Sequence, residues 1–388
     1  MKRILLVDDE PAILDGLRHV LRPERSRWQM EFAEGGEAAL AAMAARPFDV
    51  IVTDMRMPGM DGLAVLGHVR RAYPWVARIV LSGYADLASV AQASSVAHQY
   101  LLKPCEASVL RNVIERALRL QDLLSNEVLR KAVGQLGTLP SAPRVYHALS
   151  AALGQRDVEI SKVAAIVKQD VGVVTRVLQF VNSAYFGLSR RVTSVEAAIV
   201  CLGLNALRHL ALTQEVFQAF PGVSDAAFSE LERHAALTAR IARRLSTPAE
   251  ADAAFAAGLL HDAGKLVLMS RASEGFARAV DEARRRESPL FTVEKELLGA
   301  THAEVGAYLL GLWDLPHGIV EPVAFHHDAE RLATSGCGTV HAVAAADLLA
   351  HEVTEGGGAW SAALDALPAR DRLAEWREIA RAEARDFS

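Results

Sequence analysis

Short apolar runs alternate with segments of helical periodicity over the first third of the chain. The runs that suit buried strands cover residues 4–7, 50–52, 78–81 and 99–102. The segments with apolar residues at helical spacing cover residues 12–21, 36–45, 62–72 and 85–97. This alternation predicts an α/β fold with a doubly wound parallel sheet and helices on both faces. Ligands of such sheets bind beyond the carboxyl ends of the strands.

The periodicity becomes entirely helical from about residue 108 onward. Apolar residues at helical spacing continue to Val133, which predicts a last helix of the first domain running into a connecting helix. The sequence Gly134-Gln135-Leu136-Gly137 breaks this helix. The remainder is rich in Ala, Leu, Val and Arg at three- and four-residue spacing, so we expect an all-α second domain. The glycines at 356–358 predict a flexible turn before a final helix.

Composition narrows the class of protein. Of the 388 residues, 51% are apolar and 23% are charged, a balance that favours packed cores over disorder. The net charge of −5 lacks the basic excess typical of nucleic-acid binders. Three widely spaced cysteines, at 105, 201 and 337, suit a reducing compartment better than a disulfide framework. Because no secretory signal or membrane span is recognisable, we expect a cytoplasmic protein.

Charged and polar side chains follow the ends of the predicted strands. They are Asp8, Asp9, Asp54, Ser82 and Lys103. Since the carboxyl ends of parallel strands meet at one edge, we expect these side chains to share a pocket. Three close carboxylates repel one another, and a hard cation such as Mg²⁺ would relieve this repulsion. Such a pocket suits phosphoryl transfer to Asp54, with Lys103 and Ser82 binding the phosphoryl oxygens.

Each of these residues also has a purely structural interpretation. Asp8 and Asp9 suit a turn, Asp54 suits a helix cap, and Lys103 suits a solvated surface charge. Taken singly, these interpretations are the better ones. The joint placement after successive strands favours the phosphoryl-transfer pocket.

Four motifs of this segment resemble the receiver domains of two-component response regulators. They are Val7-Asp8-Asp9-Glu10, Asp54-Met55-Arg56-Met57-Pro58-Gly59-Met60-Asp61-Gly62, Ser82-Gly83-Tyr84 and Lys103-Pro104. The resemblance implies a five-stranded, flavodoxin-like sheet and phosphorylation of Asp54 by a sensor histidine kinase or a phosphotransfer protein. It implies a Mg²⁺ site formed by Asp9, Asp54 and the Met55 carbonyl, with help from Asp8. It also implies a switch in which Ser82 moves toward the phosphoryl group and Tyr100 turns inward.

Three motifs stand out in the second part of the chain, and their positions are 139–143, 169–187 and 194–204. By chemistry alone they suit structural roles, with Asn182 capping a helix and Gly203 allowing a close approach between helices. Together they resemble the HDOD family, a relative of the HD phosphohydrolases that is usually treated as a non-catalytic signalling module. Val171 departs from the proline that usually follows the aspartate in that family, and we expect a local effect.

Histidines and acids of the second half suit a metal site. They are Glu230, His234, His261, Asp262, Lys265, His302, His326, His327 and Asp347. Glu230 and His234 are four residues apart and share a helix face. Imidazoles and carboxylates on several helices form metal sites in helical bundles, and mixed ligands suit Fe, Mn, Ni or Zn. A metal-bound water could then attack a phosphodiester.

These residues resemble, in order, the metal ligands of the HD-GYP phosphodiesterases, including the lysine. The GYP element is absent, because residues 312–316 read Leu-Trp-Asp-Leu-Pro, and His302 lacks a second histidine beside it. These departures affect cyclic di-GMP recognition more than metal binding. The alternative is structural, since Thr301 to Glu304 suits a capped helix start and His326-His327 suits a surface pair.

We therefore expect a receiver domain at residues 1–120, a connecting helix at 121–135, an HDOD domain at 136–350 and a helical extension at 351–388. The favoured function is a response regulator whose HDOD domain acts through contacts with an unidentified downstream protein. A homodimer through the connecting helix is a further expectation. The alternative is a receiver-gated, metal-dependent phosphohydrolase of the cyclic-dinucleotide type. DNA binding is not expected, because no helix-turn-helix signature or basic recognition stretch follows the first domain.

Overall fold

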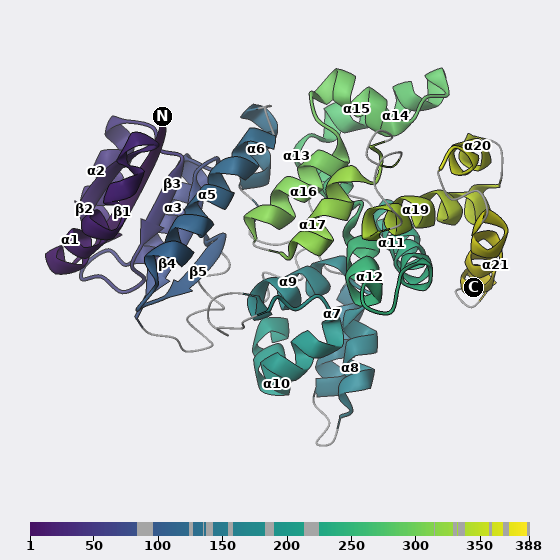
Figure 1. Ribbon diagram of the computed structural model, residues 1–388, viewed down its shortest axis with the longest axis horizontal. Helices are drawn as coiled ribbons and strands as arrows, with labels where there is room; N and C mark the ends of the chain where they lie inside the picture. Colours follow the sequence, from purple (N-terminus) through teal and green to yellow (C-terminus); the bar gives the residue numbers. More distant parts are fainter. Residues whose placement is uncertain are drawn as a thin grey trace. The chain divides into compact units, whose positions relative to one another are not determined.

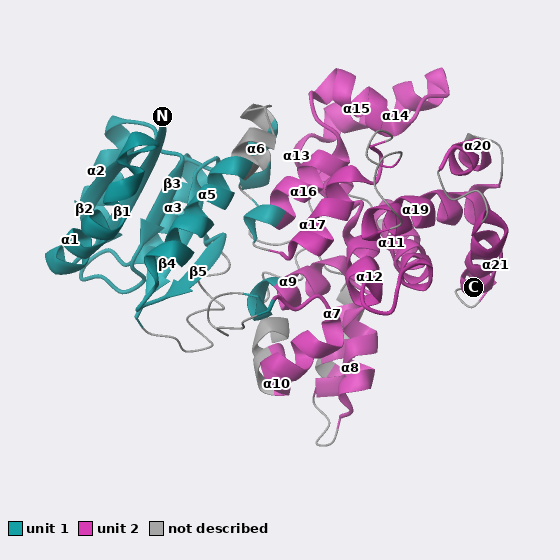
Figure 2. Cartoon of the chain, in the orientation of Figure 1, with its two compact units in different colours: residues 1–138, 179–190, 311–314 teal, residues 139–178, 191–310, 315–388 magenta. Residues whose placement is uncertain are grey.

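The structure is a computed structural model in which two compact units are distinguished (Figure 2). The described residues are 1–83, 96–123, 127–134, 136, 143–153, 158–182, 190–212, 225–313, 315–328, 332, 338–356, 359–367 and 372–385. One unit comprises residues 1–138, 179–190 and 311–314, and the other comprises the rest of the chain.

The first unit contains a five-stranded parallel sheet with the strand order β2-β1-β3-β4-β5 (Figure 1). The strands are β1 (Lys2–Asp8), β2 (Trp28–Glu34), β3 (Val50–Thr53), β4 (Ala77–Ser82) and β5 (Gln99–Leu102). The helical elements of this domain are α1 (Pro11–Val20), η1 (Arg22–Ser26), α2 (Gly36–Ala45), α3 (Gly62–Ala72) and α5 (Ala107–Leu123). The predicted α/β parallel fold is confirmed. Most of the predicted helix at 85–97 lies outside the described residues.

The core on one face of the sheet explains why α5 forms and where it packs. Ile4, Val52 and Ile79 of three neighbouring strands are buried together with Leu110 and Ile114 of α5. The two α5 residues are four apart, so they lie on the same side of the helix. Burial of this apolar stripe, at about 25 cal/mol per Å², holds the helix on the sheet.

A short helix, α6 (Glu127–Gly134), follows α5 and ends at the glycine that the sequence marks as a breaker. A Cβ on Gly134 would lie 1.7 Å from the carbonyl oxygen of Pro74, so only glycine fits there. Arg78 of β4, which is buried, donates a hydrogen bond of 2.9 Å to the Gly134 carbonyl. The end of the connecting segment is therefore anchored to a strand of the sheet.

The second part of the chain is helical throughout the residues that the structure describes. Its first helices are α7 (Pro143–Leu153), α8 (Ile160–Val167), α9 (Val171–Val181), α10 (Val195–Leu212), α11 (Asp225–Leu245), α12 (Ala251–Leu260) and α13 (Ala263–Arg271). The later ones are α14 (Ser273–Arg286), α15 (Leu290–Leu298), α16 (His302–Leu312), α17 (His317–Phe325), α19 (Thr339–Glu355), α20 (Ala359–Asp365) and α21 (Leu373–Arg385). The predicted all-α character is confirmed. Among the described residues, none of the helices combines the length and apolarity needed to cross a membrane.

Helices α11, α12, α17 and α19 pack against one another at the centre of the second unit (Figure 1). Residues 254–260 of α12 are all buried, as are residues 341–347 of α19. Both stretches are rich in alanine, and small side chains let helices approach closely. This close packing brings the polar residues at the helix ends into the interior.

Some expectations need correction or fall outside the described residues. Gly203 has a φ of 73° and a Cβ there would meet nothing within 4 Å. Its role is therefore a left-handed kink in α10, and the expected close helix approach is wrong. Helix α19 ends just before Gly356, whose φ is 89°. The flexible turn expected at 356–358 stays a prediction, because Gly357 and Gly358 lie outside the described residues, and two helices, α20 and α21, follow instead of one. Tyr84, Cys337, Asp314 and residues 139–142 and 183–187 lie outside the described residues.

The predicted domain boundaries pass through regular structure. Helix α5 continues past residue 120 to Leu123, and α19 continues past residue 350 to Glu355. The boundaries at 120, 135 and 350 stay predictions.

Candidate functional site

The first candidate site lies at the carboxyl edge of the parallel sheet. Asp8 is the last residue of β1, Asp54 directly follows β3, and Lys103 directly follows β5. The register pairs Val7 with Thr53, so the two aspartates leave the sheet side by side. Both aspartates are buried, with Asp8 2% and Asp54 8% exposed. The sequence prediction that these side chains meet is thus consistent with their positions in the fold.

The Lys103 ammonium bridges the two carboxylates. Its Nζ donates to Asp8 Oδ2 at 2.6 Å and to Asp54 Oδ1 at 2.5 Å. Burial alone would lower the pKa of Lys103, but the bonds and charges of Asp54 and Asp8 outweigh it and raise the pKa. Lys103 is therefore a fixed positive charge at neutral pH. Within the described residues, the two carboxylates thus share the Lys103 ammonium.

The second oxygen of Asp54 is held from the opposite side. Oδ2 accepts a hydrogen bond of 2.7 Å from the Arg56 main-chain N–H. The loop folds back because the Gly62 N–H donates to the Met55 carbonyl at 3.0 Å. A Cβ on Gly62 would lie 2.0 Å from the Asp54 carbonyl oxygen, so the loop requires glycine at this position. The local sequence thereby fixes the direction of the Asp54 carboxylate.

The remaining receiver residues lie around this edge. Ser82 ends β4 and is buried, and its carbonyl accepts from the Lys103 N–H at 2.8 Å. Tyr100 is buried on β5, and Asp9 is half-buried directly after β1.

The second candidate site gathers histidines and acids from six parts of the second unit. His234 lies on α11, and His261 and Asp262 form the junction of α12 and α13. His302 begins α16, His326 and His327 follow α17, and Asp347 lies on α19. Four overlapping triads have ligand atoms within 4.8 Å of one another: His302-His326-His327, His234-His261-Asp262, His234-Asp347-His351 and His261-His326-Asp347.

Several of these rings have one nitrogen fixed from behind. Nδ1 of His261 bonds the Gly258 carbonyl at 2.7 Å, and Nδ1 of His326 bonds the Val323 carbonyl at 2.9 Å. The Nε2 atoms of both rings are buried and make no hydrogen bond within the described residues. Nε2 of His261 lies 3.4 Å from Asp262 Oδ2 and 3.5 Å from Asp347 Oδ1. A carbonyl behind Nδ1 and a bare Nε2 in front is the usual arrangement of metal-ligating histidines.

The acids of this cluster lie between the rings. His234 Nε2 lies 2.9 Å from Asp347 Oδ1, and His302 Nε2 lies 3.2 Å from Asp262 Oδ1. Lys265 Nζ donates to the other oxygen of Asp262 at 2.6 Å. Oδ1 of Asp262 is buried, and apart from this close approach of His302 it makes no hydrogen bond within the described residues. Buried groups of this kind normally have partners, so these atoms are candidate ligands for a cation.

The neighbouring charges shift the pKa values of His261 and His326 in opposite directions. Burial alone would lower the pKa of His261, but the Asp262 and Asp347 carboxylates outweigh it and raise the pKa to about 10. Burial, with the positive charges of His261 and His302, lowers the pKa of His326 to about 3. Neutral His326 offers a lone pair directly, whereas His261 has to release a proton to bind a metal.

A glycine brings the two halves of the cluster together. A Cβ on Gly264 of α13 would lie 1.9 Å from the carbonyl oxygen of His302. Helices α13 and α16 therefore touch at their first turns, which places His302 beside Asp262. The short segment at residues 261–264 thus supplies two candidate ligands, His261 and Asp262. Gly264 in the same segment leaves room for a third, His302.

Glu230 is the one predicted ligand that the cluster does not include. It lies one turn before His234 on α11 with an exposed side chain, and it belongs to none of the four triads found among the described residues. Two residues that sequence reasoning missed are His351, in one triad, and Glu294, which is fully buried behind His302. The four-residue spacing of Asp347 and His351 on one helix is the signal that could have revealed the first.

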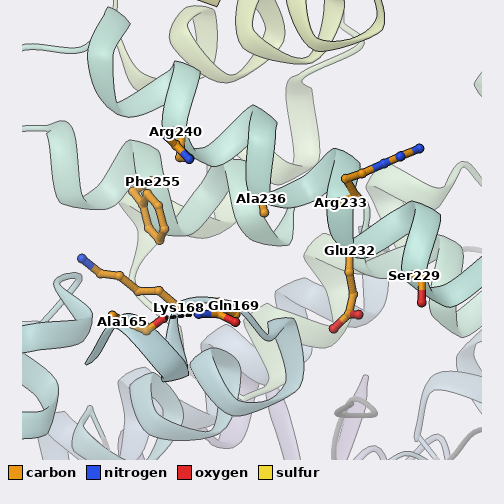
Figure 3. Close-up of a pocket in the computed structure, with 9 residues that line it drawn as sticks. All are labelled: Ala165, Lys168, Gln169, Ser229, Glu232, Arg233, Ala236, Arg240 and Phe255. Carbon is orange, nitrogen blue, oxygen red and sulfur yellow. Dashed lines mark hydrogen bonds between the residues drawn. The ribbon is translucent and has the colours of Figure 1, made fainter. Parts of the chain in front are cut away.

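A separate cavity of about 460 Å³ lies on the other side of α11. Its lining residues come from α8, α11 and α12 and from the two residues after α8 (Figure 3): Ala165, Lys168, Gln169, Ser229, Glu232, Arg233, Ala236, Arg240 and Phe255. Two of its cations are already paired, Lys168 with Glu196 and Arg240 with Glu383. At 100° per residue, His234 faces away from this side of α11, so the cavity is distinct from the histidine cluster.

Each of the two parts of the chain matches a known protein family. Residues 4–115 match the response regulator receiver domain, and residues 139–329 match the HDOD domain. The protein is therefore a response regulator with a receiver domain and a helical output domain. Its output domain belongs to the HDOD family, which is related to the HD domains.

Individual relatives are distant. The chain is 25% identical over 226 residues to an uncharacterized protein of Treponema pallidum (strain Nichols), covering 58% of this chain and 44% of that protein. It is 34% identical over 122 residues to the hydrogenase transcriptional regulatory protein HoxA of Cupriavidus necator, covering 31% of this chain and 25% of HoxA. The matches thus span less than half the length of either relative. The MmoQ response regulator from Methylococcus capsulatus str. Bath has a TM-score of 0.49 at 22% identity, covering 62% of this chain and 98% of that one.

Proposed function

We propose that this response regulator is phosphorylated on Asp54 and that the phosphoryl group controls its HDOD domain. The observation that carries the proposal is the Lys103 ammonium bonded to both Asp54 and Asp8 at the sheet edge. A phosphoryl group adds about −1.5 to −2 charge and three acceptor oxygens. Lys103 would exchange its bond to the Asp54 carboxylate for bonds to those oxygens, and the buried Ser82 hydroxyl would donate another.

The donor is the phosphohistidine of a sensor kinase or of a phosphotransfer protein. A carboxylate oxygen of Asp54 forms a bond to phosphorus while the P–N bond of the donor breaks, and the released imidazole takes up a proton. The Arg56 N–H, on Oδ2, and Lys103, on Oδ1, hold the carboxylate in place for this transfer.

The acidic residues of the receiver site also fit a Mg²⁺ ion. Asp8 and Asp54 are buried and share the Lys103 ammonium, and a second cation would further relieve the repulsion between the two carboxylates. Asp8, Asp9, Asp54 and the Met55 carbonyl offer the oxygen ligands that Mg²⁺ prefers. When bound, the ion supplies positive charge beside the phosphoryl oxygens.

The experiment that tests the acceptor is labelling with acetyl phosphate in the presence of Mg²⁺. We expect wild-type protein to be labelled and Asp54→Asn to remain unlabelled. Asp61→Asn is the matched control, because Asp61 accepts from the Ala64 N–H as the cap of α3 and asparagine also caps helices. Labelling of Asp54→Asn at the wild-type level would refute the assignment.

The output would act through contacts with a downstream protein, and β4 offers a route from the receiver site to the connecting segment. Ser82 ends this strand at the phosphorylation edge, and Arg78 of the same strand holds the Gly134 carbonyl at the end of α6. A shift of β4 would therefore move Arg78 and change its hydrogen bond to the end of α6. Light scattering before and after phosphorylation would reveal whether the connecting segment also supports a homodimer.

A second candidate function is a metal-dependent phosphohydrolase gated by the receiver. It is favoured by the Nε2 atoms of His261 and His326 and by Oδ1 of Asp262, which are buried without a hydrogen bond among the described residues and belong to overlapping triads of candidate ligands. Nitrogen and oxygen ligands together suit Fe, Mn, Ni or Zn. When bound, such a metal supplies an activated water for attack on a phosphodiester. Asp262 is oriented for ligation by Lys265 and by its place between two rings.

Elemental analysis of protein purified without chelator tests the metal centre. We expect near-stoichiometric transition metal that is lost in His261→Ala/Asp262→Ala. Metal content that this double variant leaves unchanged would show that the cluster is structural. A screen of cyclic dinucleotides, with and without acetyl phosphate, then separates a hydrolase from an output domain with a structural metal.

A further inference from the structure

His351 lies beyond residues 139–329, the segment that matches the HDOD domain. It sits one helical turn after Asp347 on α19, and its Nε2 is 3.5 Å from Asp347 Oδ1. Its ring centroid is 4.2 Å from that of His234. The three side chains form one of the four triads with converging ligand atoms, and this triad has no residue in common with His302-His326-His327.

Glu355 and Trp360, which both follow His351 in the chain, fix the orientation of its ring. Glu355 accepts from His351 Nδ1 at 2.7 Å through Oε1, and from the Trp360 indole N–H at 3.1 Å through Oε2. The Trp360 ring stacks on the His351 ring at 4.2 Å with an angle of 9° between the planes. Nδ1 is thus bonded to Glu355, which leaves Nε2 on the side of Asp347 and His234. A carboxylate behind a histidine is what metal ligands ordinarily have.

The position of His351 contrasts with that of Glu230. Glu230 is exposed on α11, one turn before His234, whereas the His351 side chain is 18% exposed. His351, and not Glu230, thus belongs to a triad with His234. The C-terminal part of α19 therefore supplies two candidate ligands, Asp347 and His351. Glu355 bonds the second of them, and Trp360 stacks on its ring.

We propose that His234, Asp347 and His351 bind a divalent transition-metal ion, beside a second ion position formed by His302, His326 and His327, with His261 and Asp262 shared between the two positions. The inference rests on the proposed metal centre of the output domain and adds a ligand from the C-terminal part of the chain. Two neutral imidazoles and a carboxylate suit Mn²⁺, Co²⁺, Ni²⁺ or Zn²⁺. Removing the Glu355 carboxylate would weaken the site without removing a ligand.

The test uses full-length protein freed of metal and titrated with Co²⁺, with bound metal counted by elemental analysis. We expect two ions in the wild type and one in His351→Ala. His351→Gln, which keeps more side-chain volume, should behave like His351→Ala. Glu355→Gln should lower the affinity of one ion about 10- to 100-fold. His317→Ala is the control, because His317 belongs to the same unit and its side chain is 82% exposed.

Tryptophan fluorescence supplies a second readout. Because Trp360 stacks on the proposed ligand, occupation of this position by Co²⁺ should quench its emission, and Trp360→Phe should lose that quenching while still binding two ions. Two ions at wild-type affinity in both His351 variants would overturn the inference and leave the metal centre standing. A single ion in the wild type would overturn it as well. A wild-type protein that binds no Co²⁺ would overturn both the metal centre and this inference.

Discussion

Oε2 of Glu294 accepts two hydrogen bonds from His302, one from the main-chain N–H at 2.8 Å and one from Nδ1 at 2.7 Å. Glu294 is fully buried on α15, eight residues before His302. These two hydrogen bonds tie His302, the first residue of α16, to α15. It also turns Nε2 of His302 toward Asp262 and His327.

Glu294→Gln should weaken metal binding at this end of the cluster by about 10- to 100-fold, because an amide behind the ring is a poorer acceptor than a carboxylate. The amide can still accept a hydrogen bond, so the helical fold should be retained. Competition with a metallochromic chelator would measure the affinity. Glu296→Gln is the control, since Glu296 lies on the same helix and its side chain is 50% exposed. Equal affinity in both variants would argue against a role for Glu294 in ligation.

Lys103→Ala should leave the sheet intact but remove the response to phosphorylation. The variant loses the only ammonium that bonds both Asp54 and Asp8 among the described residues. Hydrogen exchange with and without acetyl phosphate should show a change in β4 and α6 for the wild type and none for the variant. Lys2→Ala is the control, because Lys2 lies at the opposite end of β1 near Asp49. A wild-type response in Lys103→Ala would contradict the proposed switch.

Gly264→Ala should destabilise the second unit by about 1–3 kcal/mol, because the added methyl group would lie 1.9 Å from the His302 carbonyl oxygen. The same clash should move His302 away from Asp262 and reduce metal binding. Gly318→Ala on α17 should be neutral or stabilising by up to ~1 kcal/mol, because its Cβ makes only an ordinary contact of 3.9 Å. Thermal unfolding of the two variants tests the difference, and equal melting temperatures would show that α13 and α16 can separate without cost.

Acid should destabilise the receiver through His98. Burial first, and then the charge of Arg78, holds the pKa of His98 well below 6.5. In the unfolded chain this pKa returns to about 6.5. Below pH ~6.5 the unfolded state therefore binds a proton that the folded state does not bind. Stability falls as the pH falls toward the folded pKa, by up to about 1.4 kcal/mol per pH unit.

Urea denaturation at about pH 7.5 and about pH 5.5 measures this effect. The loss of stability should be larger in the wild type than in His98→Gln, which has no titrating ring at that position. His68→Gln, at an exposed position on α3, should behave like the wild type. An equal loss in His98→Gln would mean that other groups cause the acid sensitivity.

The local pattern of apolar and polar residues predicted most elements of the receiver fold. The expected elements at residues 36–45, 62–72 and 99–102 coincide with α2, α3 and β5. The missed strand is β2, whose sequence Trp-Gln-Met-Glu-Phe-Ala-Glu lacks a continuous apolar run. It lies at the edge of the sheet and alternates polar with apolar residues, whereas the buried central strands have continuous apolar runs.

The sequence by itself determined the class of protein and the residue types of both sites. Asp54 and Lys103 could be paired without coordinates, because the carboxyl ends of parallel strands share one edge. Helices of the output domain offer no such rule, since the facing of a buried helix depends on packing with several neighbours. Only the tertiary structure could therefore decide that Glu230 faces solvent, that Glu294 lies behind His302, and that His351 joins His234.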